Sequence, residues 1–364
     1  MKTLPKLLIF VATCQIVVKT NSQQCPAFGS EESILGWMLQ GHIYQTMMAN
    51  IGLHCLSACF KDDRCQSFNF VMSLQMCEFS DRTKEARPED FIPDADRYYF
   101  RKYIKRAQLG SISELAAESC KEIKMIEGRA SNGKYWMSSI KPGIPILAFC
   151  VYCDMTTSGQ AWTLTARFSN SDSKNWMIDS GKWWYDKNVE FGETANPSSN
   201  TDMISQAFWL VSGQEFKITR SDDSQHTALL QTTGDCLGGQ TFRTKMTSYG
   251  DFRNGTVWAS NRCLGNCRIQ YGGQYDTTDG FQQATCNGNI QNATQIGFWC
   301  DWSGGDGAVL MIGGGGATCN RADHGIGITE ADQASFVATV PEHDFGNEAN
   351  HAPAKSYSLN LWLH

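Results

Sequence analysis

The residue types best suited to chemistry are concentrated in one stretch near the C-terminus, IGGGGATCNRADHGIGITE, residues 312–330. In this stretch four consecutive glycines are followed by Cys319, Asn320, Asp323, His324 and Glu330. Glycine-rich backbone bends tightly and exposes its amide and carbonyl groups, so it can hold a phosphate, a metal ion or a catalytic residue. It can equally form a tight turn with a purely structural role.

The residues disfavour phosphate binding and catalysis. A phosphate-binding loop ends in Gly-Lys-Ser or Gly-Lys-Thr, whereas Gly316 is followed by Ala317 and Thr318. The chain contains neither Gly-x-Ser-x-Gly nor His-Glu-x-x-His, the motifs that bring a nucleophile or a metal to a base. Asp323 and His324 are adjacent, and adjacent residues of a strand face opposite sides. We therefore expect a protein that is not an enzyme.

A calcium site fits this region better. Calcium takes roughly six to eight oxygen ligands from carboxylates, amides and backbone carbonyls. The candidate ligands, all within thirty residues of one another, are Asp301, Asp306, Asn320, Asp323 and Glu330. Their spacing matches no EF-hand. The alternative is structural: Gly313–Gly316 allow close backbone packing beside Cys319, and a short strand buries Ile326 and Ile328 on one face.

The other end of the chain indicates export. Lys2 and Lys6 precede an apolar run over residues 7–18, which is too short to span a membrane. Residues 1–22 therefore read as a signal peptide cleaved after Ser22. No later stretch approaches eighteen apolar residues and no lipid-anchor or retention signal follows, so we expect a secreted, extracellular protein.

The cysteines agree with that compartment. Of fifteen, Cys14 leaves with the signal peptide and fourteen remain. An even, dense set of cysteines in an oxidising environment indicates disulfides. A zinc site is disfavoured, because the chain has no second Cys-x-x-Cys motif to match the first. Asn254-Gly-Thr and Asn292-Ala-Thr are acceptor sites for N-glycosylation, which places both on exposed loops.

The length of the chain predicts its number of domains, and its net charge excludes two classes of partner. About 340 mature residues predict two or three domains. The formal charge of −6 falls to −9 once the three lysines of the signal peptide are removed. This acidity argues against nucleic acid and against anionic membranes. Neither is therefore expected as a partner.

The first module spans residues 23–103. A predicted helix, NIGLHCLSACFKDD, places Cys55 and Cys59 one turn apart on one face. Predicted strands follow in CQSFNFV, QMCEFS and RYYFRKY. The pattern Cys-x3-Cys, Cys-x-x-Phe-x-Phe, Gln-x-Cys-x-Phe resembles the PAN/apple family. Domains of this family bind proteins or carbohydrates, so the resemblance implies an extracellular carbohydrate or matrix protein as the partner. The resemblance implies the disulfides Cys55–Cys77 and Cys59–Cys65.

Both modules have an odd cysteine count. The first module holds five cysteines and the rest of the chain nine, whereas a six-cysteine apple domain pairs its first cysteine with one near its end. If all are oxidised, an odd number of bridges joins the two modules or two molecules. Cys25 and Cys150 are the candidates, and a disulfide-linked oligomer is one outcome.

A polar linker over residues 104–119 precedes the second module, residues 120–364. Its opening contains Ser119-Cys120, NGKYW at 132–136, VYCDM at 151–155 and WTL at 162–164. These motifs resemble the fibrinogen C-terminal-like domains, which include ficolins and intelectins, and imply the disulfide Cys120–Cys153. Two departures are the weakened glycine run at 158–161 and the missing aspartate-rich calcium loop of vertebrate fibrinogens.

The C-terminal part resembles the intelectin branch, where four glycines precede a cysteine. The strings MIGGGG and RADHGIGITE are similar to secreted fibrinogen-like proteins of cnidarians, among them coral skeletal organic matrix proteins. In the related lectins, calcium orders loops near the C-terminus and coordinates sugar hydroxyls. The resemblance implies calcium as a cofactor here and sugar contacts from Trp299, Trp302 and His324.

The sequence thus predicts an α+β protein of two disulfide-rich modules, a PAN/apple domain and a fibrinogen/intelectin-like domain. The predicted function is non-enzymatic extracellular recognition or adhesion, as a matrix component that could belong to a calcified skeleton. The alternative is a calcium-dependent lectin of innate-recognition type. A lectin would lose its sugar on chelation, whereas a matrix protein would show weak, multivalent association.

Overall fold

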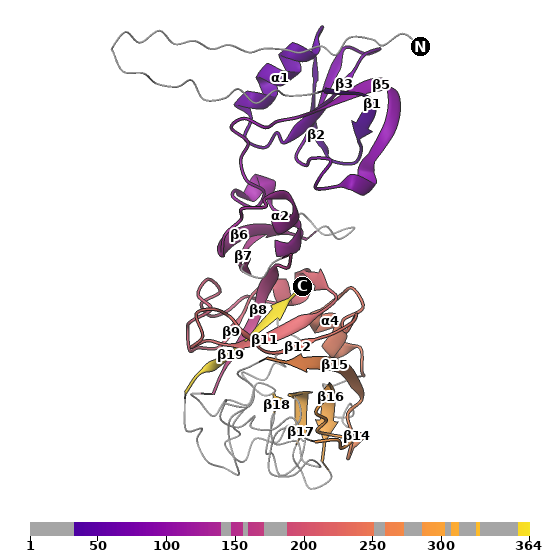
Figure 1. Ribbon diagram of the computed structural model, residues 1–364. Coiled ribbons are helices and arrows are strands. Elements are labelled where there is room, and N and C mark those ends of the chain that lie inside the picture. The colour runs from indigo at the N-terminus through magenta and orange to yellow at the C-terminus, as the bar shows by residue number, and fades with distance from the viewer. Residues whose placement is uncertain are drawn as a thin grey trace, which may run out of the picture. The chain divides into compact units, whose positions relative to one another are not determined.

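The computed structural model describes residues 33–139, 147–155, 159–170, 188–250, 259–272, 286–302, 307–312, 325–327 and 356–364. The chain divides into two compact units, one formed by residues up to 115 with 125–127, the other by 116–124 and residues from 128 onward. The boundary between residues 115 and 116 falls within the stretch 104–119 expected as a linker, whereas the segment 125–127 lies beyond it (Figure 1). No helix of the described part is long and apolar enough to cross a membrane.

The first unit is one antiparallel sheet with a helix on one face. Its elements are β1 (Ser33–Leu39), β2 (Ile43–Met48), α1 (Gly52–Lys61), β3 (Ser67–Val71), β4 (Met76–Ser80), a 3₁₀ turn at Pro88–Asp90, β5 (Phe91–Arg101) and a 3₁₀ turn at Ser113–Leu115. The strand order is β1-β5-β3-β4-β2. The predicted helix and strands are confirmed, although β5 begins six residues before the expected RYYFRKY strand.

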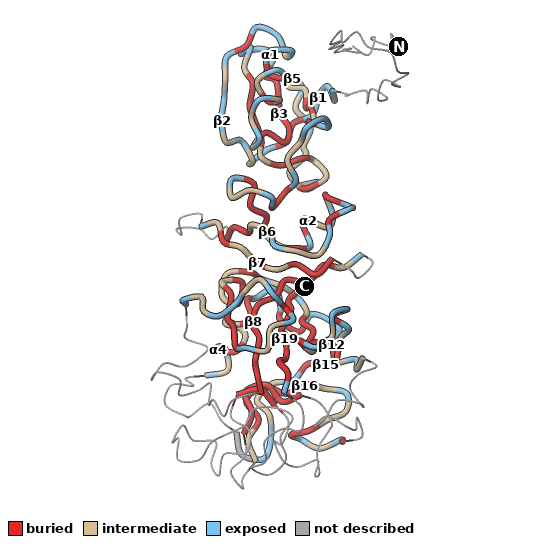
Figure 2. The backbone as a smooth tube through the Cα atoms, turned by 90° about the vertical axis from the view of Figure 1, so that its left-hand side faces the viewer, coloured by how far each residue is buried: buried red, intermediate tan, exposed pale blue. Residues whose placement is uncertain are grey.

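Helix α1 covers the apolar face of this sheet. Cys55 and Cys59 are both fully buried and form the bridges Cys55–Cys77 and Cys59–Cys65, which confirms both pairings. Because the two cysteines lie one turn apart, they fix the helix to two separate points. The buried rings beneath the helix come from Phe68, Phe70, Phe79 and Phe100. Figure 2 shows this core as red segments under α1.

A buried lysine holds the C-terminal end of α1. The side chain of Lys102 is fully buried, and its Nζ donates to the carbonyls of Cys59 at 3.0 Å and Asp62 at 2.9 Å. The last carbonyls of a helix have no partner within the helix. Lys102 therefore supplies both a donor and the positive charge that this end of the helix dipole favours.

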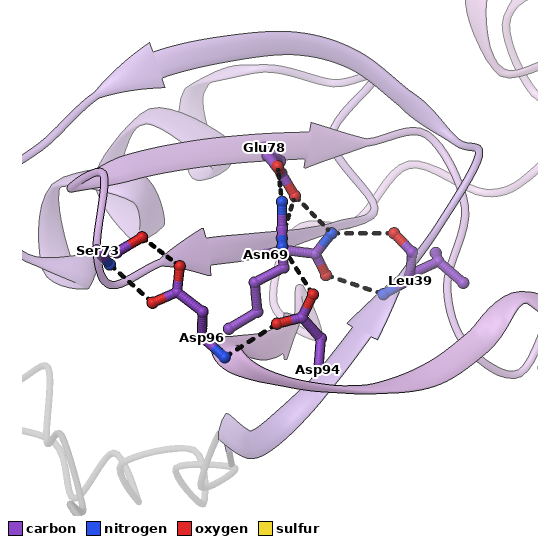
Figure 3. Close-up of polar contacts among 7 residues, drawn as sticks. Leu39, Asn69, Ser73, Glu78, Asp94 and Asp96 are labelled. Atoms are coloured by element: carbon purple, nitrogen blue, oxygen red, sulfur yellow. Dashed lines mark hydrogen bonds and ion pairs between the residues drawn. The ribbon is translucent and has the colours of Figure 1, made fainter.

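The opposite face of the same sheet is polar (Figure 3). The Asn69 amide accepts from Leu39 N and donates to Leu39 O, both at 2.9 Å, so it pairs with the end of β1 as a strand would. Asn69 also donates to Glu78, whose carboxylate accepts from Arg97. Arg97 in turn binds Asp94 at 2.7 Å. This network fixes the positions of β1, β3, β4 and β5 relative to one another.

The second unit is built mainly of strands. Its elements are α2 (Cys120–Ile126), β6 (Gly133–Ser138), β7 (Ala148–Asp154), β8 (Trp162–Ser169), β9 (Met203–Ile204), α3 (Ala207–Leu210), β10 (Ser212–Gly213), β11 (Phe216–Arg220), β12 (Ala228–Thr232), β13 (Gln240–Thr241), α4 (Phe242–Thr247), β14 (Ala259–Ser260), β15 (Gly265–Tyr271), β16 (Gln295–Asp301), β17 (Gly307–Met311), β18 (Gly325–Ile326) and β19 (Ser358–Leu363). Strand predominates over helix in both units, so the α+β label holds only roughly.

The main sheet of this unit places the last strand near its middle. The order is β18-β17-β16-β15-β12-β11-β19-β8-β7-β6, and β19 pairs antiparallel with both β11 and β8. Every residue of β8 and of β19 is buried. The fold of the second unit therefore depends on residues almost 200 positions apart in the sequence, such as Leu359 opposite Phe168.

Candidate functional site

One predicted metal ligand, Asp301, lies on the hairpin formed by β16 and β17. Asp301 ends β16 opposite Gly307, the first residue of β17. Its backbone N–H donates to Arg262 O at 3.2 Å, and its side chain is partly exposed. Of the candidate ligands Asp301 alone lies in the described part; Asp306, Asn320, Asp323 and Glu330 lie outside it.

The glycine run, together with His324, also lies outside the described residues, but both of its anchors are placed. Ile312 follows the end of β17, and Gly325 begins β18 opposite Met311. These anchors lie at the end of the hairpin opposite to Asp301, because Met311 pairs with Gly297 at the start of β16. Strand β18 then runs back along β17, and Val309 N donates to Gly327 O at 3.2 Å. The chain direction at Gly327 therefore points toward the Asp301 end.

The burial of Trp299 corrects one expectation. Its side chain is fully buried, and its indole N–H donates to Met246 O at 2.9 Å. A ring enclosed on both faces cannot serve as a wall for a sugar. Trp299 instead fastens β16 to helix α4, with its backbone in the left-handed region at φ 53°.

Trp302, by contrast, remains partly exposed. It packs against a buried cluster of Ile290, Cys300, Ala308 and Met311. Trp302 directly follows Asp301 at the end of β16, so the predicted calcium ligand and the half-exposed aromatic ring are sequence neighbours at one end of the hairpin. Among the described residues no three His, Cys, Asp or Glu side chains form a group that could hold a metal. Calcium therefore remains a prediction.

Disulfides hold this region in place. Cys263–Cys300 joins the segment between β14 and β15 to β16, and Cys236–Cys267 joins β15 to the loop between β12 and β13. Gly297 is required beside the first bridge, because a Cβ there would lie 2.3 Å from Cys263 Sγ and 2.5 Å from Cys300 Sγ. Neither bridge follows from the sequence, since family resemblance fades before these residues.

Two further cysteine predictions have clear outcomes. Cys120–Cys153 is formed as expected. Cys150 carries a free, half-buried thiol, so its pairing with Cys25 is not formed. Alternation along β7 explains the free thiol, because Cys153 faces the buried side and Cys150 the other side. Cys25 lies outside the described residues.

A cavity that the sequence did not indicate lies in the second unit. It measures about 240 Å³. Its polar lining comes from Ser119, Lys121, Thr163, Ser212, Gln214 and His364. His364 is oriented by a 2.9 Å contact between its Nδ1 and Ala161 O. These residues come from four separate segments, so only the folded chain brings their hydroxyl, amide and ammonium groups together.

A buried arginine shapes one long loop of this unit. The Arg167 guanidinium donates to the carbonyls of Thr201 at 2.6 Å, Asn196 at 2.7 Å and Glu193 at 3.0 Å. Burial lowers the pKa of Arg167 to about 10, partly offset by the nearby carboxylates of Glu193 and Asp202. Arg167 also donates to the Thr201 hydroxyl at 3.1 Å, so it positions residues 193–201 mainly through their backbone carbonyls.

One predicted glycosylation acceptor, Asn292, lies in the described part of the structure. Asn292 is partly exposed, and its Oδ1 accepts from both the N–H of Thr294 at 2.9 Å and the Thr294 hydroxyl at 2.8 Å. The amide and the hydroxyl of the acceptor triplet therefore lie together at the surface. Asn254, the other predicted acceptor, lies outside the described residues.

Comparison with protein families assigns the two units. Residues 30–104 match the family model of the PAN domain. Residues 116–252 match that of the C-terminal globular domain of fibrinogen beta and gamma chains. No curated protein matches the chain. The hairpin with Asp301 and Trp302 lies beyond the fibrinogen match, while the cavity and the Arg167 loop lie mostly within it.

Proposed function

Because the chain carries a PAN domain followed by a fibrinogen C-terminal domain, we propose that it is a non-enzymatic extracellular recognition protein and acts as a matrix component. Domains of both families are generally non-enzymatic. Disulfide-rich domains of these kinds are typical of secreted proteins, which agrees with the signal peptide expected at residues 1–22.

The observation that carries this proposal is the presence of two separately stabilised modules in one chain. The PAN domain has its own sheet, core and two disulfides, and the fibrinogen-like domain has a second sheet with its own bridges. Two binding modules on one chain raise avidity by effective concentration without a strong single site. That property suits adhesion within a matrix.

More specifically, the matrix to which the protein belongs would be that of a calcified skeleton. Its support is the resemblance of the MIGGGG and RADHGIGITE strings to skeletal matrix proteins of corals. The mature charge of −9 would favour calcium-rich surfaces over anionic ones. In this form the acidic residues near the C-terminus would contact calcium at a mineral surface.

A calcium-dependent lectin is the second candidate, and the β16–β17 hairpin favours it. Asp301 offers a carboxylate and Trp302 a half-exposed ring at the same end of the hairpin. A carboxylate and an aromatic ring at one end of a hairpin suit a calcium-bound sugar, because the metal would hold the hydroxyls and the ring would pack on the apolar face of the sugar. Asp306 and Glu330 would complete the oxygen ligands.

Glycan binding with and without calcium separates the two candidates. Residues 23–364 would be applied to a broad glycan array in millimolar calcium, and then in EDTA. Calcium-dependent binding to a defined sugar class establishes the lectin. Binding to demineralised matrix that persists in EDTA, with no glycan bound, supports the matrix component. A folded protein that binds neither surface contradicts the proposed recognition function.

Variants then test the hairpin itself. Asp306→Ala and Glu330→Ala should abolish calcium-dependent sugar binding, and Trp302→Ala should weaken it at least tenfold. Asp222→Ala is the matched control, because its carboxylate is half exposed and pairs only locally with Arg220. Equal losses in the control and the test variants would show that the hairpin is not the site.

A further inference from the structure

One end of the PAN domain exposes a group of large apolar side chains. Two segments of this domain, 43–53 and 67–77, contain no charged residue. They carry the exposed residues Met48 at 71%, Leu74 at 56%, Ile51 at 51%, Leu53 at 43% and Met72 at 39%. Exposed apolar groups of this number in one place mark an interaction surface more often than single exposed residues do.

Strand pairing shows that the two segments meet. Met48 at the end of β2 lies opposite Met76 at the start of β4, and Ala49 N donates to Gln75 O at 2.7 Å. Met72 and Leu74 lie in the turn between β3 and β4. We name Met48, Ile51, Leu53, Met72 and Leu74 the methionine-rich end. Methionine side chains adapt their shape readily, which suits a contact surface.

This end continues into an edge strand. In the order β1-β5-β3-β4-β2, strand β2 has β4 on one side and no described strand on the other. Figure 2 shows β2 as exposed and intermediate along its length. Exposed edges in natural proteins are commonly protected by lysine or proline, and the β2 sequence IYQTMM contains neither. A bulge between Ile43 and Gln45 leaves Gln45–Met48 as the regular part.

We propose that the PAN domain pairs with a second copy of this chain, β2 against β2 in antiparallel orientation, with the two methionine-rich ends packed beside the paired strands. Antiparallel pairing of identical strands around a twofold axis is self-complementary: with the axis at Thr46, Thr46 would face Thr46 of the second copy and Gln45 would face Met47, which keeps facing side chains on the same side of the sheet. Since β2 carries no charged residue, the paired strands bring no like charges opposite each other.

This pairing goes beyond the proposed recognition function and would add to it. A dimer presents two PAN and two fibrinogen-like domains, so weak individual contacts would combine into higher avidity. The pairing is non-covalent and does not involve Cys25 or Cys150. It is therefore separate from the disulfide-linked oligomer expected from the odd cysteine count.

Sedimentation velocity on residues 23–364 tests the pairing, over about 1 to 100 µM, the range of weak to moderate complexes. Wild type should dimerise with concentration, and the double variant Met48→Lys/Leu74→Lys should bind itself at least tenfold more weakly. Val189→Lys is the matched control, because Val189 is also 71% exposed but belongs to the other unit. A wild type that stays monomeric, or a double variant that dimerises as wild type does, would overturn the proposal.

A second measurement guards against misfolded variants. Hydrogen exchange on wild type at low and high concentration should show added protection at Gln45–Met48 with concentration. No change there would overturn the proposal even if the variants fail to fold. Non-reducing gels identify covalent dimers, and association carried only by them would also count against it. No ligand is used, so the outcome is independent of the glycan and matrix assays.

Discussion

Lys217 and Asp154 form an ion pair in the interior of the fibrinogen-like domain. Lys217 Nζ donates to Asp154 Oδ2 at 2.7 Å, and the side chains are only 4% and 0% exposed. The rings of Trp162 and Trp362 lie 5.1 and 5.4 Å from the same nitrogen. The pair connects β7 with β11, which are separated in the sheet by β8 and β19. The ion pair thus links two strands that are not neighbours in the sheet.

Removal of one partner should be costly. Asp154→Asn leaves the Lys217 ammonium buried without a carboxylate, and breaking a buried pair in this way costs about 3–5 kcal/mol of unfolding free energy. Urea unfolding followed by tryptophan fluorescence reports on this domain, because ten of the eleven tryptophans follow residue 120. Asp222→Asn is the control: its pair with Arg220 is half exposed, so the change should cost about 1 kcal/mol or less.

A neighbouring histidine should make this domain sensitive to acid. His226 is 5% exposed, its Nδ1 has no hydrogen-bond partner, and its ring lies 5.2 Å from that of Trp362. Burial lowers the pKa of His226, and Lys217 lowers it further, while Asp154 and Asp223 act in the opposite direction. The folded domain therefore holds this imidazole neutral, whereas the unfolded chain protonates it near its ordinary value of about 6.5.

The difference between the folded and unfolded pKa of His226 makes the domain less stable as pH falls. Above about pH 6.5 His226 is neutral in both states and costs nothing. As pH falls below that value, the unfolded state binds the proton first, so stability declines until the lower folded pKa is reached. His226→Asn should remove this decline, and asparagine tolerates the left-handed backbone at φ 52°. Melting temperatures between pH 7 and 5 measure it, with the exposed His54→Asn as control; equal slopes in all three proteins would contradict the assignment.

Arg167→Lys should loosen the loop at residues 193–201. Lysine keeps the charge but cannot donate to three separated carbonyls at once, because it lacks the planar fork of the guanidinium. We expect a loss of about 2 kcal/mol, the order of hydrogen bonds to a charged group. Limited proteolysis should cut the variant first within this loop. If Arg167→Lys and a variant at an exposed arginine, Arg268→Lys, are cut at the same rate, Arg167 does not hold the loop.

The PAN domain was predictable because its determinants are local. Cys55 and Cys59 share a helix face by spacing alone, and the alternation in SFNFV indicates a strand. The role of Lys102 was not, because its contacts to Cys59 and Asp62 lie about forty residues away in the sequence.

The fibrinogen-like domain shows more clearly what could not be predicted from the sequence. Its centre pairs Leu359 with Phe168, and its cavity draws on segments from Ser119 to His364. No periodicity connects such distant residues. Trp299 illustrates the same limit at one position: family resemblance implies a sugar contact there, but only the fold shows that its indole N–H donates to Met246 O. The chain segments that carry most of the predicted calcium ligands lie outside the described residues.

Asn292 should carry an N-linked glycan when the protein is secreted from eukaryotic cells. Its Oδ1 already accepts from the Thr294 hydroxyl at 2.8 Å, so the acceptor triplet is arranged at a partly exposed position. Intact mass before and after enzymatic deglycosylation measures occupancy. Thr294→Ala should remove one glycan, whereas Thr294→Ser, which keeps the hydroxyl, should retain it. Asn254→Gln distinguishes any glycan on the second acceptor from the one on Asn292. A Thr294→Ala protein with unchanged glycan mass would show that Asn292 is not modified.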